Sequence, residues 1–381
     1  MIYLDNAATS FPKPPVVWEA MEDIIKNKGA NPGRSGHRLS VEAGKIMWDT
    51  RELLAAFLNA DDPEEIIFTS NATEALNLAI KGCLKHGDHC ITTSMEHNSV
   101  ARPIHELKPL GIEFDIVQAD GQGIVKPQDI RRAIQENTRL IAVTHGSNLT
   151  GSIQPVEEIG AICSEAGVYY LVDAAQTAGI LPLDIKKMGA DMVALPGHKG
   201  LYGPTGTGVL YLRKGLILNP LKVGGTGGQS ETLHQPLNSP DRYESGTPNT
   251  VGIAGLQAGL KFVARVGVRN IEAKEKELLA LMLAGLRQYD EVEIYGPEEI
   301  AYRLPVVAFN IKEADASEVG FILDRVYDIA VRTGLHCAPL AHRTMGTLEK
   351  GAIRASLSYF NERREVEFFI GAIGSIIKDM A

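Results

Sequence analysis

The sequence has few cysteines and no long apolar run. Only 4 of its 381 residues are cysteine, and no two of them stand at CxxC spacing. This excludes a disulfide-stapled scaffold and gives no support to a zinc or thioredoxin-type site. No apolar stretch reaches the length that crosses a bilayer, and MIYLDNAATS has neither the basic nor the apolar part of a signal peptide. We therefore expect a cytoplasmic protein that is not inserted in a membrane.

Basic charge and nucleotide-binding motifs are also scarce. The chain carries 38 Lys and Arg against 47 Asp and Glu, a net charge of -9, which argues against binding to nucleic acid or to an anionic membrane. Neither GxGxxG nor GxxxxGK[ST] occurs, so the fingerprints of nicotinamide and Walker-type sites are absent. Glycine is plentiful instead, with 38 residues. Such an excess indicates tight turns or backbone packed close to a ligand.

The first two thirds of the chain alternate strand-like and helix-like segments. Continuous apolar runs predict strands at 65–69, 89–93, 139–145, 168–173 and 191–195. Residues 155–167 and 183–189 between the later strands are typical of helices. Apolar strands alternating with helices favour a mostly parallel sheet that is buried on both faces, which is an α/β architecture.

The pattern changes after about residue 255. A long helical stretch over 253–289 is expected to break near Gly267. Short strands are then predicted at 292–296, 304–311 and 329–333, and further helices at 316–327 and 362–378. We therefore predict a large α/β domain over 15–255 and a smaller α+β domain formed by 1–14 and 256–381.

Two residues at predicted strand ends point to pyridoxal phosphate. Asp173 ends the apolar run YYLVD, where a carboxylate is costly without a cationic partner. Lys199 lies in the glycine-rich segment PGHKG after a later strand, and a buried lysine can lose its proton and form a Schiff base. Pyridoxal phosphate needs such a lysine and an acid facing its pyridine nitrogen. The alternatives are a capping Asp and a solvated Lys.

Residues 70–73 and His97 add to this pattern. The small polar run Ser-Asn-Ala-Thr opens a predicted helix, whose free N–H groups make either an ordinary capped end or an anion site. His97 follows a predicted strand, where an imidazole can stack on a ring and move protons, or be an ordinary loop residue.

The cysteines divide into two groups. Cys83, Cys90 and Cys163 lie in apolar segments and are expected to be small buried side chains. Cys337 lies in VRTGLHCAPLAH, which indicates an exposed loop where nearby Arg332, His336 and His342 would favour a thiolate. An inert buried thiol is the alternative. Arg354 follows in a strand-like segment and is suited to bind a carboxylate, or to form an interdomain ion pair.

Together these segments make the chain resemble the cysteine desulfurase and selenocysteine lyase (NifS-like) family of the class V aminotransferase fold. The matching segments are YLDNAAT at 3–9, SNATEALN at 70–77, MEHNS at 95–99, SNLTG at 147–151, VDAAQTAG at 172–179, GHKGLYGPTGTG at 197–208, ESGTPN at 244–249, RTGLHCA at 332–338 and RASLSYFN at 354–361. They span nearly the whole chain. RTGLHCA is the segment specific for sulfur chemistry.

The resemblance implies a role for each matching residue. Lys199 would hold pyridoxal phosphate, Asp173 would pair with its ring nitrogen, and Gln176 with its ring oxygen. His97 would stack on the ring and assist proton transfer. Ala72, Thr73 and His198 would bind the phosphate, and Gly246 and Thr247 would reach it from a neighbouring subunit. Asn148 and Arg354 would bind the substrate carboxylate, and His37 and Arg332 would line the substrate pocket.

The implied activity is desulfuration of L-cysteine to L-alanine, with Cys337 as the nucleophile that becomes a persulfide. The resemblance further implies a homodimer with shared active sites, a sulfur-acceptor protein, a link to iron–sulfur cluster assembly, and no bound metal. The short spacing from Cys337 to Arg354 resembles the group with a compact catalytic loop. Pro196 departs from the serine that many relatives carry beside the phosphate. Selenocysteine lyase, aminotransferase, epimerase and sulfur-carrier functions are the alternatives on this fold.

Overall fold

The computed structural model describes residues 1–32, 36–228 and 231–380. Its strands are β1 (Ile2–Tyr3), β2 (Ile66–Thr69), β3 (His89–Thr93), β4 (Glu113–Val117), β5 (Thr138–Thr144), β6 (Tyr169–Asp173), β7 (Met192–Pro196), β8 (Gly208–Leu212), β9 (Val292–Tyr295), β10 (Val306–Ile311), β11 (Ile329–Ala330), β12 (Arg332–Gly334) and β13 (Ala352–Ser356). Its α-helices are α1 (Pro15–Asn27), α2 (Arg38–Leu58), α3 (Ala72–Cys83), α4 (Asn98–Leu107), α5 (Pro127–Ala133), α6 (Val156–Ala166), α7 (Ile185–Met188), α8 (Thr250–Val266), α9 (Val268–Leu286), α10 (Ala316–Tyr327), α11 (Pro339–Thr344) and α12 (Arg363–Met380).

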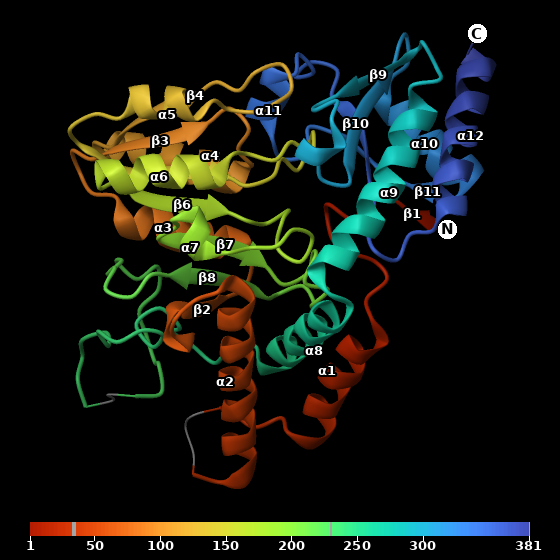
Figure 1. Cartoon of the computed structure of the whole chain (residues 1–381). Helices are drawn as coiled ribbons and strands as arrows, with labels where there is room; N and C mark the ends of the chain where they lie inside the picture. Colours follow the sequence, from red (N-terminus) through yellow and green to blue (C-terminus); the bar gives the residue numbers. More distant parts are fainter. Residues whose placement is uncertain (33–35, 229–230, 381) are drawn as a thin grey trace.

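A seven-stranded sheet forms the centre of the larger part of the molecule (Figure 1). Among the described residues its strand order is β2-β8-β7-β6-β5-β3-β4. β4, β3, β5, β6 and β7 run parallel, and only β8 is antiparallel to its neighbours β7 and β2. The predicted mostly parallel sheet is therefore confirmed.

Both faces of this sheet are covered, as the apolar strands require. One face packs against α3 and α4. The other packs against α5, α6 and α7, with α2 and α8 extending the same core. Each strand therefore buries side chains on two sides, which explains runs of continuous rather than alternating hydrophobicity.

A four-stranded sheet forms the second part, in the order β12-β13-β10-β9. All of its pairs are antiparallel, and α9, α10 and α12 cover it around a separate core. β1, from the start of the chain, pairs in parallel with β11. The N-terminal segment therefore lies with the C-terminal third (Figure 1). The boundaries 15–255, and 1–14 with 256–381, stay a proposal.

Most predicted elements appear within a residue or two of their expected places, but two differ. The predicted strand 329–333 is two short strands, β11 and β12, which join different sheets. The predicted long helix is divided at Gly267, and its halves α8 and α9 meet at a bend of 78°. Gly267 has a φ of +87°, a value that L side chains rarely adopt, so the residue type permits the break.

Among the described residues, no single helix is both long and apolar enough to cross a membrane. Only α8 and α9 taken together meet the criteria of length and composition, as a sharply bent pair.

Candidate active site

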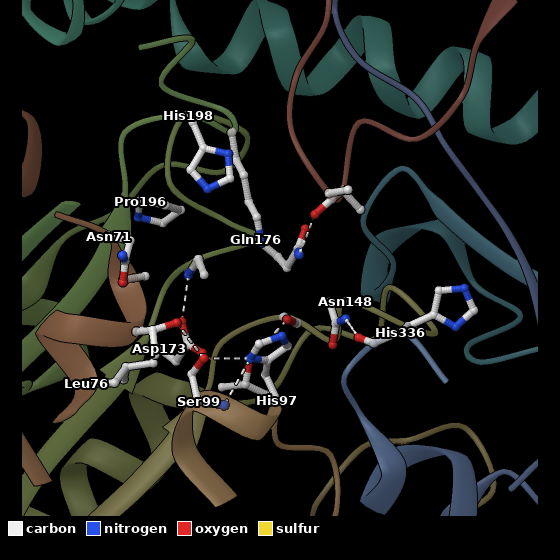
Figure 2. Close-up of a pocket in the computed structure, with 18 of the residues that line it drawn as sticks. Asn71, Leu76, His97, Ser99, Asn148, Asp173, Gln176, Pro196, His198 and His336 are labelled. Carbon is white, nitrogen blue, oxygen red and sulfur yellow. Dashed lines mark hydrogen bonds between the residues drawn. The ribbon is translucent and has the colours of Figure 1, made fainter. Parts of the chain in front are cut away.

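A cavity of about 190 Å³ opens where β5, β6 and β7 end (Figure 2). In α/β sheets the carboxyl ends of the strands are the usual place for a ligand. Ten of the residues singled out from the sequence line this cavity: Ala72, Thr73, His97, Asn148, Asp173, Gln176, His198, Lys199, Arg332 and Arg354. Thr144 and Pro196, the last residues of β5 and β7, line it too.

Asp173 is a buried carboxylate without a cationic hydrogen-bond partner among the described residues. It is the last residue of β6, and its Oδ1 accepts a hydrogen bond from the backbone N–H of Ala175 at 2.9 Å. Burial raises the pKa of Asp173, while this backbone bond and the charge of Lys199 oppose the rise. A ligand that brought a protonated ring nitrogen would stabilise the ionised form.

Lys199 is the matching basic group. Burial lowers the pKa of Lys199 to about 8, with Asp173 acting in the opposite direction. Its Nζ makes no hydrogen bond within the described part of the chain. A substantial fraction of this amine is therefore unprotonated near neutral pH, which is the form that attacks a carbonyl.

His97 is held in one tautomer. It caps α4, and its Nδ1 accepts a hydrogen bond from the backbone N–H of Ser99 at 3.0 Å, with the Ser99 hydroxyl at 2.9 Å. We assign the ring proton to Nε2 from this network. Burial lowers the pKa of His97 to about 4, and the Lys199 charge adds to the effect. The ring is thus neutral at physiological pH.

The start of α3 forms the far wall of the cavity. Asn71 caps this helix by accepting a hydrogen bond from the N–H of Glu74 at 2.9 Å, which leaves the N–H groups of Ala72 and Thr73 at the cavity. The Thr73 hydroxyl lies 2.8 Å from that of Ser99. Gly208 permits this arrangement, because a Cβ there would stand 2.4 Å from the carbonyl carbon of Asn71. Small polar groups and free N–H groups suit an anion.

His198 and Gln176 complete this side. The Nδ1 of His198 lies 3.1 Å from the Thr9 hydroxyl, and burial lowers the pKa of His198 to about 4. One N–H of the Gln176 amide is donated to the carbonyl of Ala7 at 3.1 Å. The amide is therefore fixed at the rim, from which its remaining groups face the cavity (Figure 2).

These features complement three parts of pyridoxal phosphate. The uncompensated Asp173 matches a pyridinium nitrogen, the buried amine of Lys199 matches an aldehyde, and the helix start at Ala72 matches a phosphate. The residues present therefore fit the cofactor. Pro196 carries no hydroxyl and no N–H, so it adds no hydrogen bond to the phosphate.

Arg354 supplies the buried cation on the opposite wall. Its Nη2 forms an ion pair with Asp5 Oδ1 at 2.6 Å, and its Nη1 donates to the carbonyl of Asn148 at 2.8 Å. Its Nε is buried and has no hydrogen-bond partner among the described residues. Arg354 lines the cavity, and a guanidinium in that position is suited to bind a carboxylate.

Asn148 contacts the thiol segment as well as Arg354. Its Nδ2 donates to the carbonyl of His336 at 2.7 Å (Figure 2). Cys337 follows His336 and is exposed, whereas the other three cysteines are buried. The Sγ of Cys337 lies 3.9 Å from Nη2 of Arg332. Cys337 itself does not line the cavity, but its thiol lies beside a guanidinium that does.

The expectation that His336 and His342 supply positive charge to this thiol is wrong. Burial lowers the pKa of His336 to about 3, and burial also lowers the pKa of His342. Both rings are therefore neutral at physiological pH, and their nitrogens bond to each other at 3.2 Å. Arg332 is the cation beside the thiol.

Besides Cys337, three predicted site residues do not line this cavity in the described part of the chain. His37 caps α2 through a bond from the N–H of Ser40 to its Nδ1 at 3.2 Å, and it is exposed. Gly246 and Thr247 line a separate cavity with Ser70 and Glu74, beside the start of α3. Their contribution to a site stays a prediction that concerns a neighbouring subunit.

The structure adds two residues that had no assigned role. Asp5 neutralises Arg354, and its place in the YLDNAAT segment was the only sequence signal. Glu96 is buried at the ends of β3 and β5, where it accepts bonds from Thr93 Oγ1 at 2.6 Å and from the N–H of Thr144 at 3.0 Å. Burial raises the pKa of Glu96 to about 8, so it is mostly protonated at neutral pH and supports the loop that carries His97.

Comparisons with known proteins identify the family of the chain. The family model of aminotransferase class V matches residues 2–369. A probable cysteine desulfurase of Methanothermobacter thermautotrophicus is 37% identical over 100% of this chain and 94% of its own length. A cysteine desulfurase of Yersinia pseudotuberculosis is 36% identical, with 99% and 94% covered. The apo structure of a cysteine desulfurase from Thermococcus onnurineus superposes with a TM-score of 0.94 at 38% identity, covering 99% of this chain and 95% of the other.

Proposed function

The chain belongs to the class V aminotransferase family and, within it, to the cysteine desulfurases, and we propose that it converts L-cysteine to L-alanine with Cys337 as the sulfur acceptor. The observation that carries this assignment is the position of Cys337. It is the exposed cysteine of the four, it follows a cavity-lining residue, and the guanidinium of Arg332 lies beside its sulfur.

Bound pyridoxal phosphate would supply an electron sink for bonds at the α and β carbons of the amino acid. Asp173 would keep the ring nitrogen protonated, and Lys199 would hold the cofactor. The amine of Lys199, with its pKa lowered to about 8, can then accept and return the proton at Cα. Neutral His97, with its proton on Nε2, can donate a hydrogen bond in the cavity without adding charge.

Arg354 would orient the substrate by its carboxylate. The Nε of Arg354 lacks a partner, while Asp5 and the Asn148 carbonyl hold the other two nitrogens in place. A fixed guanidinium loses little conformational entropy when the carboxylate binds, so the substrate sulfur is presented in one direction.

The sulfur step then needs only Cys337. Its thiolate attacks the sulfur of the substrate, an S–S bond forms, and the C–S bond breaks. The bonding electron pair remains on the β carbon, which takes up a proton and leaves as the methyl group of alanine. Cys337 retains the sulfur as a persulfide, and the Arg332 guanidinium lies close enough to interact with the anionic sulfur.

We further propose a homodimer and an acceptor protein. Large apolar side chains are exposed along α1 and α2, at Trp18, Ile25, Val41 and Trp48, which is unusual for a surface that faces only water. Burial of this surface between two copies would bring Gly246 and Thr247 of one copy towards the phosphate of the other. The exposed position of Cys337 supports transfer of its sulfur to a second protein.

The test is L-cysteine turnover by the cofactor-loaded protein. We expect alanine release and a mass increase of one sulfur atom on the peptide that contains Cys337. Cys337→Ala should lose both, and Cys163→Ala, which removes a buried thiol, should keep both. Persulfide on another cysteine, or equal alanine release by Cys337→Ala, would overturn the assignment.

A further inference from the structure

The turn that carries Cys337 has an uncommon backbone. His336 has a φ of +51° and Cys337 a φ of +56°, and the N–H of Ala338 bonds to the carbonyl of Leu335 at 2.9 Å. Two central residues with positive φ are the pattern of a type I′ turn, which glycine, asparagine and aspartate favour. Cysteine rarely adopts the conformation of Cys337, so contacts from the surrounding structure must hold it.

Two of these contacts fix the backbone carbonyls of the turn. The Nδ2 of Asn148 donates to the carbonyl of His336 at 2.7 Å. The N–H of Asn98, at the start of α4, donates to the carbonyl of Cys337 at 2.8 Å. The backbone of the turn is therefore held by Asn148 and by the start of α4. The side chain of His336 makes separate hydrogen bonds.

The ring of His336 is the end of a buried hydrogen-bond chain. Its Nε2 lies 3.3 Å from the carbonyl of Arg332, and its Nδ1 lies 3.2 Å from Nε2 of His342. The Nδ1 of His342 lies 2.8 Å from the hydroxyl of Thr347. The two rings are inclined by only 7°, and His342 and Thr347 are almost fully buried.

The hydrogen bonds of this network can be donated in only one direction, from Thr347 towards Arg332. A carbonyl can only accept, so Nε2 of His336 carries the ring proton and its Nδ1 is an acceptor. The proton donated to that Nδ1 comes from Nε2 of His342, whose own Nδ1 must accept from the hydroxyl of Thr347. Each ring carries one proton and uses both nitrogens. A second proton on His336 would place its Nδ1–H against the Nε2–H of His342.

We infer that His342 is a positioning residue for the reactive thiol: through its bond to His336 it holds the left-handed turn that places the sulfur of Cys337 beside Arg332. His342 lines no part of the cavity within the described chain, so its effect passes through His336. The chain also ends on the backbone of Arg332, so one buried network fixes both the thiol turn and the segment that bears its cation. This inference rests on the proposed sulfur chemistry only for its effect on turnover.

The test compares His342→Phe, which keeps a flat ring and removes both nitrogens, with His342→Gln, whose amide can still donate to His336. We expect His342→Phe to form the Cys337 persulfide about tenfold more slowly, with an unchanged KM for L-cysteine and an unchanged cofactor absorption band. Iodoacetamide should alkylate Cys337 at least threefold faster, because the turn is no longer held. His342→Gln should recover part of both effects.

Thr347→Val removes only the far end of the chain and should give smaller changes in the same direction. It also provides the measurement if His342→Phe does not fold. The matched control is His89→Phe, because His89 is equally buried and its Nδ1 lies 2.8 Å from the hydroxyl of Thr138 at the opposite end of β3. This variant should leave alkylation of Cys337 unchanged.

Alkylation and turnover separate the possible outcomes. Wild-type protein that forms no persulfide contradicts the proposed function, and the alkylation comparison still tests the chain. Wild-type behaviour of both His342→Phe and Thr347→Val overturns the inference. So does faster alkylation of the buried Cys83, Cys90 and Cys163 together with Cys337, since that result indicates general loosening.

Discussion

In the proposed reaction Asp173 and Cys337 act on the same substrate, but different contacts hold them in place. Asp173 ends a central strand, and the ladders to β5 and β7 fix its backbone. Cys337 lies in a turn between β12 and α11, where Asn148 bonds to the carbonyl of His336 and His342 bonds to the ring of His336. The backbone of Asp173, on the cofactor side, is therefore held by the central sheet. The turn of Cys337, on the thiol side, is held by a few hydrogen bonds. This difference is suited to a fixed cofactor and a sulfur that must be passed on.

The largest expected effect comes from Lys199→Ala on the cofactor side. The purified variant should lack the near-visible absorption band of the bound cofactor. It should lose at least about 10³-fold in alanine release, because the group that holds the cofactor and moves the proton is gone. Absorption spectra and alanine assays measure both effects.

Lys13→Met is the matched control. Burial also lowers the pKa of Lys13 to about 8, yet Lys13 does not line the cavity, and its Nζ donates to the Ser10 hydroxyl and to the backbone carbonyl of His198. We expect this variant to keep the absorption band. Loss of the band in both variants would show that disturbance of the segment around His198, rather than removal of the Lys199 amine, abolishes the band.

A smaller effect on activity is expected for Arg354→Lys. Arg354 contacts Asn148, which also bonds to the turn that carries Cys337. Lysine lacks the planar fork, so one charge-assisted bond to the substrate carboxylate is lost, a loss of about 1.5–3 kcal/mol. KM for L-cysteine should rise about 10- to 100-fold. Steady-state kinetics on the loaded enzyme give this value.

Arg303→Lys separates substrate binding from stability. Arg303 is also fully buried, but it donates to three backbone carbonyls, at Val306, Pro297 and Tyr295. We expect lower thermal stability and an unchanged KM. An unchanged KM in Arg354→Lys would remove Arg354 from the carboxylate site.

The smallest effect on activity is expected at Glu275, which lines neither the cavity nor the turn of Cys337. It is buried in α9, and burial raises its pKa to about 8 from 4.5. Between these two values folding must bind a proton, so this residue lowers wild-type stability as the pH rises from 4.5 to 8. Glu275→Gln removes that cost. The variant should therefore be more stable than wild type at pH 8 and equally stable below pH 4.5.

Thermal unfolding at pH 4 and pH 8 measures this difference, and alanine release should not change. A stability difference that is independent of pH would show that the carboxyl is already ionised in the folded protein. A change in turnover would connect α9 to the chemistry and weaken the division into two sides.

Much of the cofactor side could be predicted, because its residues follow apolar strands. The strand pattern located Asp173 at the end of β6, and parallel strands bring their carboxyl ends to one edge. The thiol side was predicted less well. Its segment indicated a reactive cysteine, but the charges assigned to His336 and His342 were wrong, since burial keeps both rings neutral. Sequence spacing does not reveal burial.

The amino-acid sequence by itself determined the order of strands and helices, the family, and the chemical groups available to the pocket, because periodicity and local motifs carry that information. Only the tertiary structure decided how those groups are paired. Asp5 meets Arg354 across 349 positions, and Asn148 meets the carbonyl of His336 across 188. Such contacts depend on how two sheets pack together, and they decide which nitrogen is free, which ring is neutral and where the sulfur stands.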